Sequence, residues 1–232
     1  GNIFPSQRTY TLRGSMIACR VRMKPNERKT LRLAFSPDIP QKNTIVNRII
    51  EEQGTFENES YRVQYGPNGI TSIVCRATGE ELLDQSAPAL GAPVYQIFPR
   101  GKRDDAAGFG YSARTKPNME IYQPELLSFE LVEEGEVLTH FKAAYRIKGA
   151  AEASSHYYLY QGLPKIMVTA EIAKELVRDP EGMYLSLPFD AEGGEWYLDK
   201  VGAFFKPGEQ LPGGCCDYYA VNRGVVLSGA RT

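Results

Sequence analysis

The sequence has few of the residues that build metal sites and no long hydrophobic run. It contains 2 histidines and 4 cysteines in 232 residues, and no pair of cysteines has the CxxC spacing typical of a zinc site. No apolar segment approaches the roughly 20 residues needed to span a bilayer. Lys plus Arg number 27 against 28 for Asp plus Glu. No whole-molecule field therefore favours a nucleic acid or an anionic membrane, and we expect neither as a partner.

The cysteines also give no indication of a disulfide framework. Cys215 and Cys216 are adjacent, and neighbouring cysteines do not bridge each other without strain. Free cysteines are usually buried as small apolar side chains. We expect that role for Cys19, Cys75, Cys215 and Cys216.

The sequence is rich in aromatics, which make up 11% of it and include 14 tyrosines. Tyr61, Val63 and Tyr65 alternate with polar residues, the period of a half-buried strand. Residues 67–69 (Pro-Asn-Gly) supply a tight turn, and the β-branched stretch from Ile70 to Cys75 follows. This segment predicts a β-hairpin.

Alternation elsewhere predicts more strands. Val137 to Ile147, Ser154 to Tyr160 and Ile166 to Ala173 predict a three-stranded antiparallel meander, with Val137, Phe141, Ala143, Tyr145 and Ile147 on one face. Met16 to Met23 and Lys29 to Phe35 also alternate and are joined by turn residues 24–27, which predicts a second hairpin.

One segment, Gln41 to Gln53, has the spacing of a helix. Its apolar residues Ile45, Val46, Ile49 and Ile50 fall on one helical face. Because they are β-branched, a strand is the alternative.

Turn signals recur about every 8 to 15 residues after Gly66, the spacing of a sandwich. We expect an all-β antiparallel fold with at most one or two short helices. Residues 1–56 would form an N-terminal hairpin and connecting segment, and residues 57–232 the main domain; the alternative is one continuous domain.

The amino-acid sequences of several segments resemble the β-sandwich region of glycoside hydrolase family 38, the retaining α-mannosidases. The first is ENESYRVQYGPNGITSIVCRATGEELLD, from Glu57 to Asp84. Later segments extend the resemblance in the same order: Leu131 to Ile147, Tyr157 to Ile172, Leu185 to Asp190 (LSLPFD) and Gly208 to Ser228 (GEQLPGGCCDYYAVNRGVVLS). The resemblance implies an antiparallel supersandwich similar to that of galactose mutarotase.

The same resemblance implies a non-catalytic role. Family 38 enzymes carry their catalytic zinc and Asp nucleophile in an N-terminal α/β barrel, and no segment here matches that barrel. No catalytic residue and no metal ligand is carried over, and the zinc is expected in the missing catalytic domain of the parent. We therefore expect a fragment, truncated near Thr232, that supports the catalytic barrel of the parent chain and is inactive alone.

Aromatic and polar residues near the C-terminus suggest contact with a mannose-containing glycan. Sugars stack their apolar faces on aromatic rings, while charged and amide groups bind the hydroxyls. The candidate contact residues are Trp196, Tyr197, Asp217, Tyr218, Tyr219 and Arg223. The alternative is that these aromatics fill a core or an interface with the barrel.

Two other functions remain open. One is a stand-alone carbohydrate-binding β-sandwich module. The other is an aldose epimerase, in which a histidine acid and a carboxylate base act across a sugar ring; His140, His156 and Glu171 can share one sheet face. The adjacent acid pairs at 80–81, 104–105 and 133–134 are expected on solvated strands or turns, because strand neighbours point to opposite faces.

Overall fold

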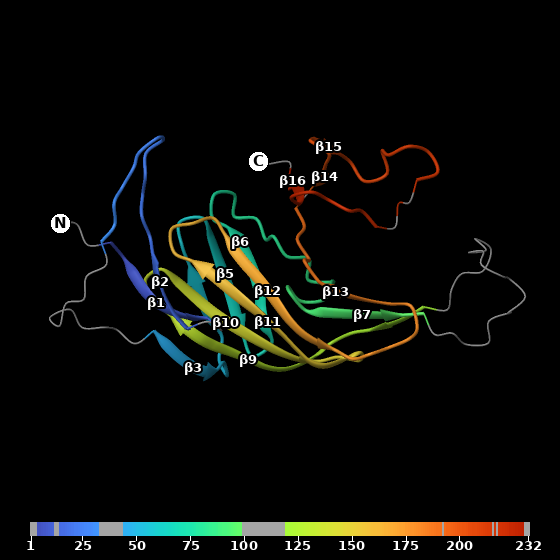
Figure 1. Cartoon of the computed structure of the whole chain (residues 1–232), viewed down its shortest axis with the longest axis horizontal. Helices are drawn as coiled ribbons and strands as arrows, with labels where there is room; N and C mark the ends of the chain where they lie inside the picture. Colours follow the sequence, from blue (N-terminus) through green and yellow to red (C-terminus); the bar gives the residue numbers. More distant parts are fainter. Residues whose placement is uncertain are drawn as a thin grey trace, which may run out of the picture.

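The regular structure in the described part of the chain is antiparallel β-sheet. The computed structural model describes residues 4–11, 14–32, 44–98, 119–191, 193–214, 216 and 218–229. In these residues sixteen strands form five antiparallel sheets, with no helix (Figure 1). The predicted all-β, sandwich-like class is confirmed. Within the described ranges, no helix has the length and hydrophobicity to cross a membrane.

The largest sheet has five strands in the order β12-β11-β10-β9-β3. Its strands β10, β11 and β12 are the predicted meander, which is confirmed. The five residues predicted to share one face of β10 and its flanks are all buried. The strands of this sheet are β3 (Ile45–Ile49), β9 (Glu125–Glu134), β10 (Leu138–Arg146), β11 (Ala150–Tyr160) and β12 (Ile166–Lys174).

A second layer covers the apolar face of this sheet. One part of it is the sheet β4-β5-β6, formed by β4 (Gly54–Glu57), β5 (Tyr61–Gly66) and β6 (Gly69–Cys75). The predicted hairpin is β5–β6 and is confirmed. Gly69 takes the positive φ of +92° that its turn requires. The other part is the sheet β13-β7-β8, formed by β7 (Pro93–Ile97), β8 (Glu120–Tyr122) and β13 (Glu181–Leu185).

Aromatic rings fill the space between the layers. The ring centroid of Phe141 lies 4.6 Å from that of Tyr65 and 5.3 Å from that of Phe129. Phe129 also contacts Tyr157 at 6.0 Å. Tyr65 lies on β5, whereas the other three rings lie on the five-stranded sheet, so the contact of Phe141 with Tyr65 joins the two layers. Aromatic side chains each bury a large apolar area, and these rings therefore form much of the shared core.

The helix predicted over Gln41 to Gln53 is wrong where the structure describes it. Residues 45–49 form the edge strand β3, which pairs with β9. The β-branched side chains of Ile45, Val46 and Ile49 lose χ1 freedom in a helix and fit a pleated sheet, so the strand alternative holds. Residues 41–43 lie outside the described ranges.

The predicted N-terminal hairpin is only partly present. β2 (Gly14–Cys19) pairs with the preceding β1 (Ser6–Thr11) and not with residues 29–35, of which 33–35 lie outside the described ranges. The turn at residues 24–27 does form, with the Glu27 amide donating to the Lys24 carbonyl at 3.1 Å. Residues 20–32 form one long loop that projects beyond the strands (Figure 1); we call this loop the basic arm.

The last three strands form a separate small sheet. It has the order β15-β14-β16 and consists of β14 (Glu195–Lys200), β15 (Ala203–Phe205) and β16 (Val225–Ser228). In Figure 1 it lies beyond the sandwich layers. The N-terminal segments β3 and β4 pair with strands of the sandwich; the division of the chain at residues 56 and 57 stays a prediction.

The cysteines depart from expectation. Cys19 and Cys216 are exposed and Cys75 is half-buried, so burial as small apolar side chains is wrong for these three. Cys215 lies outside the described ranges. The exposure of Cys216 follows from its place in a loop beyond the core.

Candidate functional site

The C-terminal sheet, which carries most of the predicted contact residues, has one aromatic face and one polar face. Trp196 and Leu198 alternate onto the same face of β14, and Leu198 pairs with Phe205 of β15. Tyr219 meets Phe205 edge-on, with 6.3 Å between ring centroids. Trp196 and Tyr219 therefore lie on the aromatic face.

Tyr197 lies on the opposite, polar face. Its hydroxyl donates to Glu195 Oε2 at 2.8 Å, and Lys206 Nζ forms an ion pair with Glu195 Oε1 at 2.6 Å. The hydrogen bond from Lys206 lowers the pKa of Glu195, and the hydrogen bond to Glu195 raises the pKa of Tyr197. Glu195 is therefore held ionised, as an acceptor and not as an acid.

Arg223 belongs to the same polar face. Its Nε donates to Asp199 Oδ2 at 2.7 Å. Asp199 is only 3% exposed, whereas the side chain of Arg223 is 79% exposed. Asp199 thus fixes the inner end of the guanidinium while the outer end faces solvent with free donors.

The remaining predicted residues are less well placed for one site. Tyr218 is 78% exposed. The Tyr219 hydroxyl accepts from the Gly208 amide at 3.0 Å, which ties the loop after β15 to the aromatic face. Asp217 lies outside the described ranges.

The six predicted residues are therefore not brought together on one surface. The structure groups Tyr197 and Arg223 on the polar face and Trp196 and Tyr219 on the aromatic face. The carboxylates of the polar face, Glu195 and Asp199, are four positions apart on a strand, about 13 Å along its axis. Retaining glycosidases need two carboxyl groups about 5 Å apart. The polar face can bind hydroxyl groups, but it lacks the geometry for acid–base hydrolysis.

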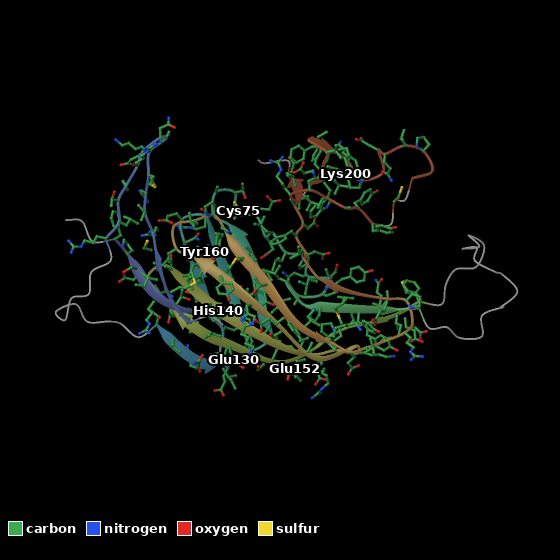
Figure 2. All side chains as sticks on the ribbon, viewed as in Figure 1. Cys75, Glu130, His140, Glu152, Tyr160 and Lys200 are labelled. Atoms are coloured by element: carbon green, nitrogen blue, oxygen red, sulfur yellow. The ribbon has the colours of Figure 1, made fainter. Side chains whose placement is uncertain are left out.

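A second polar cluster lies on the outer face of the five-stranded sheet, far along the molecule from the C-terminal sheet. Figure 2 shows His140 in the large sheet and Lys200 in the separate C-terminal sheet. His140 Nε2 lies 2.9 Å from His156 Nδ1, and the His140 ring stacks on Tyr158 with 4.3 Å between centroids. His156 Nε2 lies 3.7 Å from Glu171 Oε2.

The environment keeps both histidines neutral. Burial, the neighbouring His156 and Lys142 lower the pKa of His140 to about 4. Burial also lowers the pKa of His156, against the opposing effect of Glu171. An epimerase needs its acid and base on opposite sides of a sugar ring, and here the side chains touch. No ring fits between them, so the geometry does not favour this alternative.

Glu133 is a buried acid, although the sequence predicts that it is solvated. It is 3% exposed, and it accepts hydrogen bonds from Gln7 Nε2 at 2.6 Å, Thr9 Oγ1 at 2.9 Å and Thr44 Oγ1 at 3.1 Å. The expectation of solvation is wrong for Glu133, because β1 covers this part of the sheet. Glu134 is exposed as predicted.

A β-bulge explains the position of Glu133. Phe141 pairs with Leu131, but the preceding His140 pairs with Glu133, so Val132 is an extra residue in β9. The bulge moves Glu133 from the core face of Leu131 to the polar face of His140. Simple alternation gives no signal for this change of face.

No family model matches the chain, and no curated protein matches it.

Proposed function

We propose that this chain is the non-catalytic β-region of an α-mannosidase of the family 38 type. In this role it supports the catalytic barrel of the parent enzyme and contributes to glycan contact. The proposal rests on the resemblance of its segments to that family and on one structural observation. The parent, with zinc in its barrel, would hydrolyse α-mannosidic bonds, and this region would not.

The supporting observation is the poor burial of the C-terminal sheet. Among its described residues, Leu198 is the only buried apolar side chain. Large apolar residues of the sheet and its loops are exposed, namely Trp196, Val201, Phe204, Leu211, Tyr218, Val221, Val225 and Val226. They lie on both faces of the sheet, because Phe204 pairs with Asp199 and Val226 with Tyr197, whereas Val225 pairs with Leu198. Large exposed apolar surfaces often mark sites that bind a partner. The parent's barrel is the occupant that we propose.

The polar face supplies the proposed glycan contact. Tyr197 offers a ring face, while Glu195 and Arg223 offer an acceptor and donors for sugar hydroxyls. Arg223 is positioned by Asp199, so little conformational entropy is lost when a hydroxyl binds.

The first experiment reads the coding sequence on both sides of this segment and expresses the longer product. We expect an upstream α/β barrel with His and Asp zinc ligands, and zinc-dependent hydrolysis of p-nitrophenyl α-mannoside. Replacing Phe204 and Trp196 with Ser is expected to reduce the yield of folded, active enzyme. The matched control replaces the exposed sandwich residues Leu127 and Ile121 with Ser. A flanking sequence without a barrel would overturn the proposal.

The stand-alone carbohydrate-binding module remains the second candidate, because the Arg223 guanidinium and Tyr218 are open to solvent in the chain itself. Calorimetric titration with methyl α-mannoside separates the two. Millimolar or tighter binding that is lost in Arg223→Ala favours the module. Absence of binding favours the supporting role.

A further inference from the structure

The basic arm differs in charge from the rest of the molecule. Residues 20–32 contain six basic residues and one acidic residue, a formal charge of +5, although the whole chain carries −1. The remaining residues therefore carry −6. The basic residues are Arg20, Arg22, Lys24, Arg28, Lys29 and Arg32.

The cations of the arm are mostly unpaired within the described residues. Lys29 forms the arm's single ion pair there, 3.5 Å from Glu27 of the same arm. Elsewhere the cations commonly have carboxylate partners, as in Arg146 with Glu125 and Lys174 with Glu181, both at 2.7 Å. Unpaired cations clustered on an extended loop repel each other, and an anion that binds them relieves this repulsion.

A groove lies where the arm joins the body. Three cations, Arg20, Arg22 and Lys29, line it together with Phe4 and Pro5, and its volume is about 290 Å³. Arg20 and Arg22 are two positions apart, and both line this groove.

The groove continues into a second one of about 420 Å³, which shares Pro5 and Arg20. Its other lining includes the carboxylates Glu59 and Glu136 and the amide Gln161. Arg20 is held at the junction, because its amide donates to the Pro5 carbonyl at 3.0 Å and its guanidinium covers Gly162. Gly162 has a φ of +72°, so a side chain there would be strained and would also collide with the guanidinium.

We propose that this pair of grooves binds an anionic glycan, a sugar chain that bears sulfate or carboxylate groups. The cations bind the anionic groups, and Phe4 and Pro5 form an apolar floor for a sugar ring. The acids and amide of the second groove accept and donate hydrogen bonds to neutral hydroxyls. The choice of a glycan over other polyanions rests in part on the carbohydrate role proposed above.

Other polyanions fit the arm less well. Single-stranded nucleic acids are bound by stacking successive bases on aromatic side chains, and residues 20–32 contain no aromatic residue. The −6 charge of the remaining chain repels a long duplex that extends beyond the arm. An anionic membrane requires an apolar face that inserts; the groove offers one aromatic ring, Phe4, and the arm adds two exposed large apolar side chains, Met23 and Leu31, among its six cations.

The test measures binding of the full chain to a sulfated heparin octasaccharide by fluorescence anisotropy at 50 and 200 mM NaCl. We expect binding that weakens at the higher salt concentration. The variant Arg20→Gln/Arg22→Gln is expected to weaken binding roughly tenfold, because two charge contacts are lost. The control Lys165→Gln/Lys200→Gln removes the same charge elsewhere and is expected to have little effect. Phe4→Ala is expected to weaken binding without changing the salt dependence.

Binding of three other ligands to the full chain distinguishes the possible outcomes. We measure in parallel a neutral mannan octasaccharide, a 12-nucleotide single-stranded DNA and vesicles with phosphatidylserine. Preference for the sulfated sugar that depends on Arg20 and Arg22 supports the proposal, even if methyl α-mannoside does not bind at the polar face. Equal or tighter binding of DNA or vesicles, an equal loss in the control variant, or no binding of the octasaccharide would overturn it.

Discussion

The five-stranded sheet and the C-terminal three-stranded sheet are both antiparallel and both rich in aromatic residues, yet they bury them very differently. In the first, Phe129, Phe141 and Tyr157 are almost inaccessible, and the ring of Phe129 contacts the other two rings on the core face of the sheet. In the second, Trp196 and Phe204 are exposed, and Phe205 contacts the ring of Tyr219 at a loop.

The difference shows that strand pairing alone does not make a core. The C-terminal sheet has regular hydrogen bonding between β14 and both of its neighbours, but no second layer from the described part of the chain covers its aromatic face. Isolated small sheets are marginally stable in water because they bury too little apolar area. We infer that the sandwich is stable by itself, whereas the C-terminal sheet depends on a surface supplied from outside.

The largest effect is expected from Phe141→Ala, in the centre of the sandwich. The substitution removes a ring that contacts Tyr65 and Phe129 and leaves a cavity, which costs about 3–5 kcal/mol of the free energy of unfolding. Urea denaturation measures this loss. Leu127→Ala, at an exposed position of β9, serves as the control and is expected to change stability by less than about 1 kcal/mol. Equal losses in the two variants would contradict the two-layer core.

The next effect concerns the contact between β1 and the large sheet. Gln7 donates to Glu133 and accepts from the amides of Val137 and Leu138, at 3.1 and 3.0 Å. Gln7→Ala leaves buried polar groups without partners and is expected to cost about 2–3 kcal/mol. The control is Gln64→Ala, at an exposed position of β5. If both variants unfold at the same urea concentration, the network does not hold β1 in place.

The third effect is a loss of stability in acid caused by the histidine pair. Because the pKa of His140 is lowered to about 4 in the folded state, the unfolded chain takes up the proton first as the pH falls below about 6.5. The stabilisation is therefore present above about pH 6.5 and is lost as the pH falls towards 4. From pH 7.5 to 5 we expect a loss of about 2 kcal/mol.

Substitution of His140 isolates the contribution of the histidines to the loss of stability at low pH. The groups that face the pair are Glu133, Lys142, Tyr158 and Glu171. His140→Phe keeps a ring stacked on Tyr158 and cannot be protonated, so the difference in unfolding free energy between pH 7.5 and 5 is expected to shrink. An unchanged pH dependence in this variant would assign the effect to the carboxylates.

Sequence patterns predicted the parts of the fold in which local alternation and burial agree. The β5–β6 hairpin and the β10–β12 meander alternate along most of their length, so their strands and their core-facing residues were predictable. The segment around Ile45 was ambiguous because its apolar spacing fits a helix while its β-branched residues fit a strand. Pairing with β9 decides this, and that contact is distant in sequence.

The candidate sites were less predictable because they depend on register and on coverage. The contact of His140 with His156 needs the pairing of β10 with β11, and the burial of Glu133 needs both a bulge at Val132 and the placement of β1. Trp196 and Tyr197 are adjacent in sequence, and this was enough to group them. On a strand the same adjacency places them on opposite faces.

The smallest effect on global stability is expected from Phe205→Ala in the C-terminal sheet. Phe205 contacts Tyr219, and its strand pairs with Leu198, but it lies outside the sandwich core. Loss of its ring is expected to change the urea transition of the sandwich by less than about 1 kcal/mol, because the sheet opens locally at a lower free energy than the whole molecule. The same substitution is expected to speed hydrogen exchange of the amides in β14 and β16, while exchange in β10 and β11 stays unchanged.

Mass spectrometry of exchanged peptides measures both regions in one sample, with Phe141→Ala as the matched change in the core. If Phe205→Ala instead lowers stability as much as Phe141→Ala, and speeds exchange in both regions, the C-terminal sheet folds as one unit with the sandwich and does not depend on an outside surface.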